Sequence, residues 1–277
     1  MEKIGIDIGG TTIKAGLIEK NEIKILFKVK TPKKKREIIN KLYFICDNLI
    51  TKKTKFIGLG IPGTINNKGL TNKLKNIDFA NVNLKKLFEN RYKIKVNVNN
   101  DANCFALAEA IYGKGKDFDN VLGITLGTGL GTGLVINKKI YSGRGAALEY
   151  GSNIINIQSL SSVEDFLGKK AIIKSAKEYN LNIKEPKDLY NLALKKDKNA
   201  IKFWNEYGSI LGLMLSNLVK TFDPDIIIIG GNISDAWKFF SKDMKKALNK
   251  HTNLKPCPVY KSEIEETGVI GASLLSL

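Results

Sequence analysis

Two hydrophobic patterns alternate along this chain. Short runs rich in Ile, Val and Leu are typical of buried strands, and longer stretches with an apolar residue every three or four positions are typical of helices. In the first hundred residues the first pattern predicts strands at 3–8, 14–19, 23–30, 56–60 and 94–98. The second pattern predicts helices at 36–51 and 84–91. Three strands followed by helix, strand, helix and strand indicate an α/β domain.

The same order begins again after a helix expected at 103–112. Further strands are expected at 121–125, 133–136, 139–141, 225–229 and near Val259. Further helices are expected at 163–166, 169–179, 186–195, 201–222, 237–250 and 268–275. We therefore expect a small N-terminal α/β domain at 1–102 and a larger α/β domain with a helical insertion at 103–267. The last helix, at about 268–277, is expected to pack back on the first domain.

A glycine-rich turn between two strands occurs twice, as GIDIGGTT at 5–12 and, in weaker form, as GITLGTG at 123–129. Such a repeat indicates one structural unit used twice. Without a Cβ, the backbone of these turns can approach a ligand closely and aim several N–H groups at one anion. The two turns are therefore predicted to bind a chain of phosphates, although either one alone is compatible with a plain β-hairpin.

The residues of the two turns fit neither common phosphate-binding motif. Because the first turn lies between strands, it is not a P-loop, which opens a helix. The glycines of the second stand at every other position, unlike a Rossmann fingerprint. The first turn contains Gly9, Gly10, Thr11 and Thr12, and Lys14 follows as the first residue of the next expected strand. The second turn contains Gly127, Thr128, Gly129, Gly131 and Gly133.

Two acidic residues are candidates for chemistry. Asp7 lies in an apolar strand, where a carboxylate is costly unless it is paired or near a metal. It would suit a Mg²⁺ site through water, because Mg²⁺ keeps much of its hydration shell. Asp101 follows the strand at 94–98, at the strand end where α/β folds place ligands. It could accept the proton of an attacking hydroxyl, although Asn and Asp are also ordinary helix N-caps.

A third segment, DPDIIIIGGN at 223–232, is a buried strand followed by two glycines. Gly230 and Gly231 would let a flat ring approach the backbone. The alternative is a simple turn from strand to helix.

Composition adds a strong positive charge. The 277 residues carry a formal net charge of +18, but only three of the 45 basic residues are arginine. Because arginine is the preferred reader of phosphates and bases, we expect no nucleic-acid partner. Apolar runs stay far below the ~20 residues that span a bilayer, and the chain opens directly on a predicted strand, so we expect a cytoplasmic protein without a membrane partner. Three scattered cysteines and one histidine favour neither a zinc site nor a disulfide framework.

Five segments occur in a characteristic order: DIGGTTIK, GIPG, NNDAN, LGTGLGTG and DPDIIIIGGNIS. Together they resemble the ROK family of sugar kinases and regulators, within the actin and hexokinase superfamily, over nearly the whole chain. The resemblance implies two ribonuclease-H-like domains with a central cleft that holds ATP, Mg²⁺ and a sugar. It also implies a homodimer.

The same resemblance implies a role for each segment. The two glycine turns, with Lys14, would hold the phosphates, and Gly230, Gly231 and Asn232 would lie by the adenosine. Gly63 and Asn100 would line the sugar pocket together with Asp101, the base for the 6-hydroxyl.

This chain departs from the family pattern around the sugar. The family usually has an Ala-Gly-Glu-x-Gly-His segment, followed by a cysteine-rich zinc loop. Here Glu149 is kept, Ser152 replaces the histidine, and Ser162 stands where the last zinc cysteine should be. Glu164 matches a sugar-binding glutamate of the family, although an acid at a helix start can also be merely solvated. We therefore expect sugar contacts from Glu149, Ser152 and Glu164, and no zinc.

These observations predict an ATP-dependent hexose kinase, glucokinase-like, that phosphorylates the sugar 6-hydroxyl. Alternatives are another acceptor (an N-acetylhexosamine, mannose or fructose) and polyphosphate as the donor, which some zinc-less relatives use. A hypothesis of another class is that the protein is a non-catalytic sugar sensor. Family regulators usually carry an N-terminal helix-turn-helix, for which residues 1–6 leave no room. A chaperone-like ATPase module would need a substrate-binding domain that the pattern does not predict.

Overall fold

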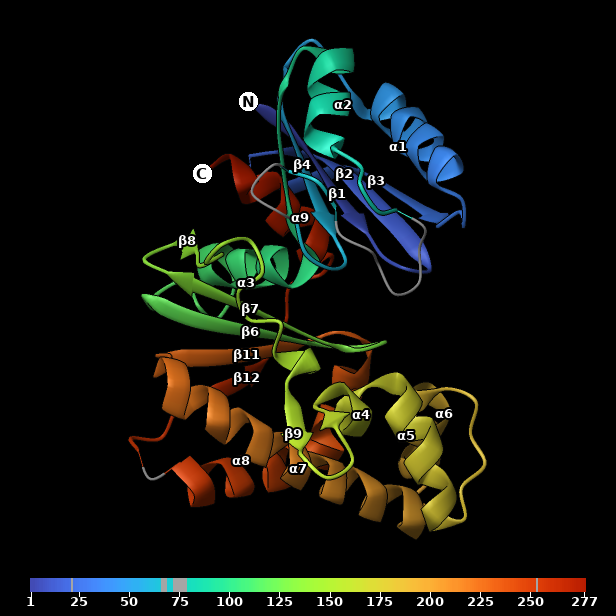
Figure 1. Ribbon diagram of the computed structural model, residues 1–277, viewed down its shortest axis with the longest axis vertical. Helices are drawn as coiled ribbons and strands as arrows, with labels where there is room; N and C mark the ends of the chain where they lie inside the picture. Colours follow the sequence, from blue (N-terminus) through green and yellow to red (C-terminus); the bar gives the residue numbers. More distant parts are fainter. Residues whose placement is uncertain (21, 66–68, 72–78, 253) are drawn as a thin grey trace. The chain divides into compact units, whose positions relative to one another are not determined.

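Figure 1 shows the computed structural model, which describes residues 1–20, 22–65, 69–71, 79–252 and 254–277. The chain divides into two compact units. The first unit comprises Met1–Asp119, Gly133–Leu148 and Glu263–Leu277, and the second comprises Asn120–Thr132 and Glu149–Ser262. Residue 102, after which the domain limit was expected, lies in the first turn of helix α3 (Asp101–Tyr112). All of this helix belongs to the first unit.

The first unit is built on a five-stranded sheet of order β3-β2-β1-β4-β5. Strands β1 (Glu2–Ile8), β2 (Thr12–Glu19) and β3 (Glu22–Lys30) form an antiparallel meander. Strands β4 (Thr54–Ile61) and β5 (Lys95–Asn100) run parallel to β1. The carboxyl ends of β1, β4 and β5 therefore meet at one edge of this sheet.

Alternation along the strands gives the sheet two different faces. Apolar side chains of β1 and β4, such as Ile6 and Leu59, share a buried core with helix α1 (Lys35–Leu49) and helix α2 (Leu84–Tyr92). The residues between them, which point to the other face, include glycines.

A row of glycines on that second face seats helix α9 (Thr267–Ser273). Gly16, Gly5 and Gly58 are paired in register across β2, β1 and β4. A Cβ at Gly5 would lie 2.0 Å from the carbonyl oxygen of Val269, and one at Gly58 would lie 1.8 Å from that of Ala272. Since these distances are far below van der Waals contact, only glycine lets α9 lie this close to the sheet.

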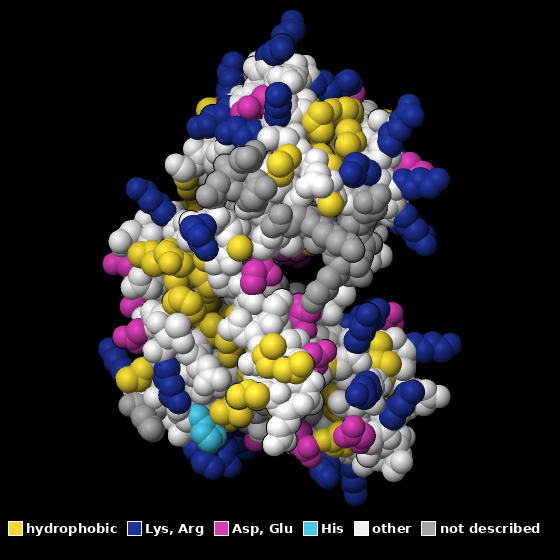
Figure 2. Space-filling model, viewed as in Figure 1, with side chains coloured by type: hydrophobic (Ala, Val, Ile, Leu, Met, Phe, Trp, Pro, Cys, Tyr) yellow, Lys and Arg dark blue, Asp and Glu magenta, His cyan; other side chains and the backbone are white. Residues whose placement is uncertain are grey.

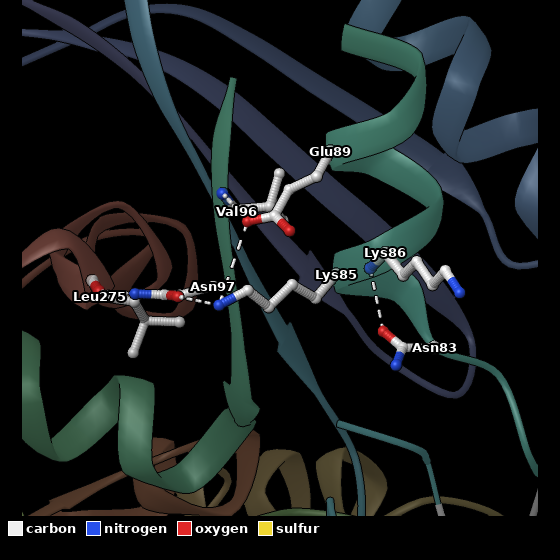
Figure 3. A network of polar contacts seen from close by, with 7 residues as sticks. All are labelled: Asn83, Lys85, Lys86, Glu89, Val96, Asn97 and Leu275. Atoms are coloured by element: carbon white, nitrogen blue, oxygen red, sulfur yellow. Dashed lines mark hydrogen bonds and ion pairs between the residues drawn. The ribbon is translucent and has the colours of Figure 1, made fainter. Parts of the chain in front are cut away.

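Side-chain hydrogen bonds fix the end of the chain beyond α9 (Figure 3). Asn97 of β5 donates from Nδ2 to the Leu275 carbonyl at 2.7 Å and accepts from Lys85 of α2 at 3.5 Å. Glu89 of α2 accepts from the backbone N–H of Val96 at 3.3 Å. The C-terminal residues are thereby tied to β5, and β5 to α2.

The second sheet has the order β12-β11-β6-β7-β8. Its strands are β6 (Asn120–Leu126), β7 (Leu130–Ile136), β8 (Lys139–Ile140), β11 (Ile226–Gly230) and β12 (Val259–Lys261). With β6 matched to β1, this is the strand order of the first sheet. The repeat predicted from the two glycine turns is therefore confirmed, as is the α/β fold.

Helices make up most of the second unit, as the pattern predicted for the insertion. They are α4 (Glu164–Leu167), α5 (Lys169–Ala176), α6 (Pro186–Leu194), α7 (Lys198–Phe222) and α8 (Trp237–Thr252). Helices α7 and α8 pack tightly, because a Cβ at Gly212 would lie 2.1 Å from the Met244 carbonyl oxygen. Two short strands, β9 (Ile154–Asn156) and β10 (Ser161–Ser162), form a hairpin before α4.

Most expected elements differ from the structure by one to three residues at an end, as three examples show. Helix α3 begins at Asp101 instead of 103, because Asn100 caps it. Strand β7 begins at Leu130 instead of 133, since its alternate glycines hide the strand pattern. The helix expected at 169–179 is α-helical only to Ala176 and ends in a 3-10 turn.

The basic side chains are distributed, and they do not form one patch on the face that Figure 2 shows. Among the described residues, the structure contains no helix that is both long enough and apolar enough to cross a bilayer.

Candidate functional site

The predicted site residues fall into two groups, one in each unit. In the first unit Asp7, Gly60 and Asn99 are in register across β1, β4 and β5, near the carboxyl ends of the strands. Neighbouring strands lie about 4.8 Å apart. The two acidic candidates, Asp7 and Asp101, thus come from the same edge of one sheet, although they are 94 positions apart in the sequence.

Asn100 connects two other residues that are predicted to contact the sugar, Gly63 and Asp101. Its side-chain oxygen accepts from the N–H groups of Ala102 at 2.8 Å and Asn103 at 3.2 Å, so it caps α3. Its Nδ2 donates to the Gly63 carbonyl at 3.0 Å. Gly63 has φ 81°, a conformation that favours glycine. The N-cap reading of this motif is therefore correct, and the same cap fixes the first residue of α3, Asp101.

Asp7 carries an unusual charge environment for a carboxylate. Its pKa is raised to about 6, chiefly by burial, while Lys14 lowers the pKa and the carboxylate of Glu266 raises it. Lys14 faces Asp7 across the antiparallel pair of β1 and β2. Above pH 6 the Asp7 carboxylate is ionised, as a ligand of a divalent cation must be.

Thr31 holds the first glycine turn in shape. Its Oγ1 donates to the Gly9 carbonyl at 2.7 Å, and its N–H donates to the Thr11 carbonyl at 2.9 Å. In a planar trans peptide the N–H points opposite to the carbonyl. The N–H groups of Gly10 and Thr12 therefore point away from Thr31, which orients two donors of the turn in the way an anion site requires.

Only glycine fits at position 9, because a Cβ there would lie 2.8 Å from the Thr12 carbonyl oxygen. Its N–H donates to that same oxygen at 2.9 Å, which closes the turn. Neither this closure nor the bonds of Thr31 could be read from the sequence, since Thr31 only follows the third strand and carries no motif.

Lys14 forms an ion pair that the sequence did not indicate. Its Nζ lies 2.7 Å from Oε2 of Glu266, the residue directly before α9. A Cβ at Gly268, two residues further on, would lie 2.5 Å from Oδ2 of Asp7. The start of α9 thus contacts the side chains of both Asp7 and Lys14.

In the second unit the second glycine turn lies between β6 and β7. The N–H of Gly127 donates to the Gly129 carbonyl at 3.0 Å, and the Gly127 carbonyl accepts from the N–H of Lys169 at 3.2 Å. A Cβ at Gly127 would meet nothing within 4 Å, and its φ is not in the left-handed region. No contact within the described structure explains a glycine there, whereas close approach of a ligand would.

The other glycines of this segment have neighbours. A Cβ at Gly129 would lie 2.3 Å from the carboxylate of Glu164, which also accepts from the Leu130 N–H at 3.4 Å. Gly131 and Gly133 belong to β7, so they lie in a strand and not in the predicted turn. A Cβ at Gly133 would lie 2.5 Å from the Ala102 carbonyl oxygen, so packing on α3 already requires glycine there.

Glu164 therefore borders the second glycine turn, in addition to the sugar role that its alignment implies. Glu149 precedes a short 3-10 turn, Tyr150–Ser152, and the N–H of Ser152, the last residue of the turn, donates to the Glu149 carbonyl at 3.0 Å. Tyr150 anchors this turn by donating from its hydroxyl to the Met214 carbonyl at 2.9 Å. Glu149 and Ser152 are exposed.

The double glycine after β11 lies against the end of β6. Gly230 pairs with Thr125. Gly231 has φ 85°, and a Cβ there would lie 2.3 Å from the Leu126 carbonyl oxygen. Asn232 begins a 3-10 turn, Asn232–Ala236. The residues expected by the adenosine thus adjoin the strand that leads into the second glycine turn.

Comparison with known proteins agrees with this arrangement. The fold is that of ROK glucokinase structures, the actin-like ATPase fold: a ROK family glucokinase from Streptomyces griseus, solved with glucose and AMPPNP, superposes with a TM-score of 0.88. It is 27% identical, and the match covers 99% of each chain. The model of the ROK family matches residues 3–277, and this chain belongs to that family.

Two relatives of known name show the range of the family. An N-acetyl-D-glucosamine kinase from Haemophilus influenzae is 29% identical over an alignment of 304 positions, which covers 99% of this chain and 98% of the relative. A glucokinase from Streptomyces coelicolor is 30% identical over 275 residues, which cover 89% of this chain and 87% of the relative.

Proposed function

We propose that this protein is an ATP-dependent hexose kinase that transfers the γ-phosphate to the 6-hydroxyl of glucose. The observation that supports the proposal is the edge of the first sheet, from which Asp7, Lys14 and Asp101 all come, in a chain of the ROK family. A carboxylate at the end of β5 and a glycine turn after β1 supply the two halves of such a transfer, a base and a phosphate site. The sugar kinases among the relatives support the reaction class.

Asp101 would act as the base. Phosphoryl transfer depends mostly on positioning and on stabilising charge, so the base need only orient the hydroxyl and accept its proton. Asn100 would fix Asp101 through the cap of α3 and would hold Gly63 beside it through its amide. Glu149, Ser152 and Glu164 would contact the sugar ring.

The two glycine turns would hold the phosphates, the first as Gly9 to Thr12 with Lys14, and the second as Gly127 to Gly129 with the start of β7. Support comes from the donors that Thr31 orients and from the open space beside Gly127. Gly230, Gly231 and Asn232 would contact the adenosine.

Asp7 fits a role as a Mg²⁺ ligand through water. Its oxygens are the ligand type that Mg²⁺ prefers, and its pKa of about 6 leaves it ionised at neutral pH. Bound Mg²⁺ would neutralise charge on the transferred phosphate. No zinc is expected, since residues 149–165 contain neither histidine nor cysteine.

A second acceptor deserves equal testing, N-acetylglucosamine. The observation that favours it is the 29% identity to the N-acetyl-D-glucosamine kinase over almost the full length of both chains. Ser152 also changes a residue of the sugar pocket, so the acceptor cannot be transferred from the family pattern alone. We further propose a cytoplasmic homodimer with no nucleic-acid or membrane partner, as the family resemblance and the composition imply.

The test is an ADP-release assay with ATP and Mg²⁺ on a panel of glucose, N-acetylglucosamine, mannose and fructose. Rapid turnover with glucose is expected, and preferred turnover with N-acetylglucosamine would establish the second acceptor instead. Sugar phosphate that forms only with polyphosphate in place of ATP, measured as the sugar phosphate itself because this reaction releases no ADP, would contradict the donor. Binding of a sugar without turnover under either donor would contradict the enzyme and favour a sensor.

A further inference from the structure

Glu266 lies at the edge of the first sheet that carries the first glycine turn, and it belongs to none of the motifs described above. It precedes α9, whereas its partner Lys14 is in β2, and the two charged atoms are 2.7 Å apart. The side chains of Lys14 and Glu266 are 31% and 21% exposed. The pair is therefore partly shielded from water, where a charge-assisted hydrogen bond is stronger than at an open surface.

The side chains of Asp7 and Lys14 point to the face on which α9 lies. Asp7 is two residues from Gly5 in β1, and Lys14 is two residues from Gly16 in β2, so all four share one face of the sheet. Helix α9 is seated on those glycines and leads directly back to Glu266.

The backbone places Glu266 with little freedom. Its carbonyl accepts from the N–H groups of Val269 at 2.9 Å and Ile270 at 3.1 Å. Its φ of 51° lies in the left-handed region, which glycine or asparagine usually occupies. A glutamate in that conformation, with its carboxylate on Lys14, points to a use for the side chain.

We propose that Glu266 positions Lys14 for the phosphates of the nucleotide. The proposal rests on the proposed function. A lysine side chain has four rotatable bonds and loses that freedom when it binds a ligand. Because Glu266 already holds the ammonium group beside Asp7, part of this cost is met before the nucleotide arrives.

The local charge supports this role. Two carboxylates, Asp7 and Glu266, surround one ammonium group, which leaves a net negative charge without ligand. A divalent cation that accompanies the nucleotide would offset this negative charge locally, and Lys14 could then contact a phosphate oxygen while Glu266 still fixes its direction.

The experiment compares Glu266→Gln with Glu265→Gln, a matched control that removes the same charge from the exposed neighbouring residue. AMPPNP affinity is measured by calorimetry, and KM for ATP, KM for the sugar and kcat by ADP release. Glu266→Gln is expected to weaken AMPPNP binding and to raise KM for ATP, both about tenfold. KM for the sugar, and every constant of Glu265→Gln, should stay within about twofold.

A second comparison separates positioning from a structural role. In a Lys14→Met background, Glu266→Gln should change AMPPNP affinity by less than about twofold, since the group it positions is gone. Glu266→Asp keeps the charge on a shorter side chain and should restore part of the affinity. Melting temperatures of all variants show whether each is folded.

Additive losses in the double variant would overturn the proposal. So would tighter AMPPNP binding by Glu266→Gln, because Glu266 would then compete with phosphate for Lys14. Wild-type protein that binds AMPPNP but phosphorylates no sugar would contradict the proposed function alone, and the binding comparison would still decide the role of Glu266. Wild-type protein that binds no AMPPNP would contradict both.

Discussion

Single residues in this protein combine a structural and a chemical task. Asn100 caps α3 and also binds the Gly63 carbonyl, so the local preference for Asn at an N-cap and the predicted sugar site use the same side chain. Asp101, the proposed base, is the next residue, so the backbone of the capped helix end would hold it in direction. Asp7 shows the opposite relation, because its burial raises its pKa and so costs stability.

The role of Asp101 predicts a selective loss of catalysis. Asp101→Asn keeps the shape of the side chain but cannot accept a proton, so kcat should fall by about 10²–10⁴-fold. AMPPNP affinity and melting temperature should remain those of the wild type. Asp117→Asn, at an exposed carboxylate of the same unit, is the control. Activity near that of the control would remove Asp101 as the base.

The raised pKa of Asp7 predicts a pH-dependent effect on stability. The folded protein holds the Asp7 proton up to about pH 6, whereas the unfolded chain loses it near 3.8, so this group destabilises the fold increasingly as pH rises through that range. Asp7→Asn should therefore raise the free energy of unfolding by up to about 3 kcal/mol above pH 7, with little difference below pH 4.

Urea denaturation between pH 4 and 8, without nucleotide and with a chelator present, measures this difference. If the difference in free energy of unfolding between Asp7→Asn and wild type does not change with pH, burial does not set the pKa of the Asp7 carboxylate. The variant is also expected to lose activity, which is the usual relation between a strained site and stability.

At the scale of elements, the glycines fall into two kinds, those required by packing and those beside open space. The row of Gly16, Gly5 and Gly58 serves packing, because α9 occupies the space their side chains would fill. Gly127 serves no packing contact among the described residues, since its missing side chain would enter open space. The two kinds of glycine should respond differently to a methyl group.

Gly58→Ala is expected to displace α9 from the sheet. The added Cβ would lie 1.8 Å from the Ala272 carbonyl oxygen, so the helix must move, at a cost of about 3 kcal/mol or more. Amide hydrogen exchange should then show faster exchange in α9 than in wild type. Unchanged stability and exchange would contradict the packing described here.

Gly127→Ala should leave stability unchanged to within about 0.5 kcal/mol, because its Cβ meets no atom within 4 Å. If the nucleotide approaches the backbone at this turn, the methyl group should weaken AMPPNP binding, measured by calorimetry. A loss of stability with normal nucleotide binding would reverse this assignment.

At the scale of the whole molecule, the sequence predicted the architecture well, and the reasons are physical. Strand β11 is a continuous apolar run, and β1 places an isoleucine at every second position, so both patterns predict buried strands. The repeated glycine turn revealed one strand order used twice. Limits were less predictable where composition hides the pattern, as in β7, whose first half alternates glycine with other residues.

The candidate site was predicted only where residues stand close in sequence within a motif. Thr31 and Glu266 contact Gly9 and Lys14 because the tertiary fold brings distant segments together, and neither carries a local signal. Glu164 was predicted by alignment, but its contact with the second glycine turn could be seen only in the structure.

The most direct measurement of the central claim is the chemical identity of the product. Phosphorus NMR of a reaction with ATP, Mg²⁺ and glucose should show ADP and one sugar phosphate at the 6-position. The same reaction with 6-deoxyglucose, which lacks the accepting hydroxyl, should show no sugar phosphate. Phosphate at another carbon, or on 6-deoxyglucose, would contradict the assignment of the 6-hydroxyl to Asp101, and the absence of any sugar phosphate from glucose and the other hexoses would contradict the hexose kinase itself.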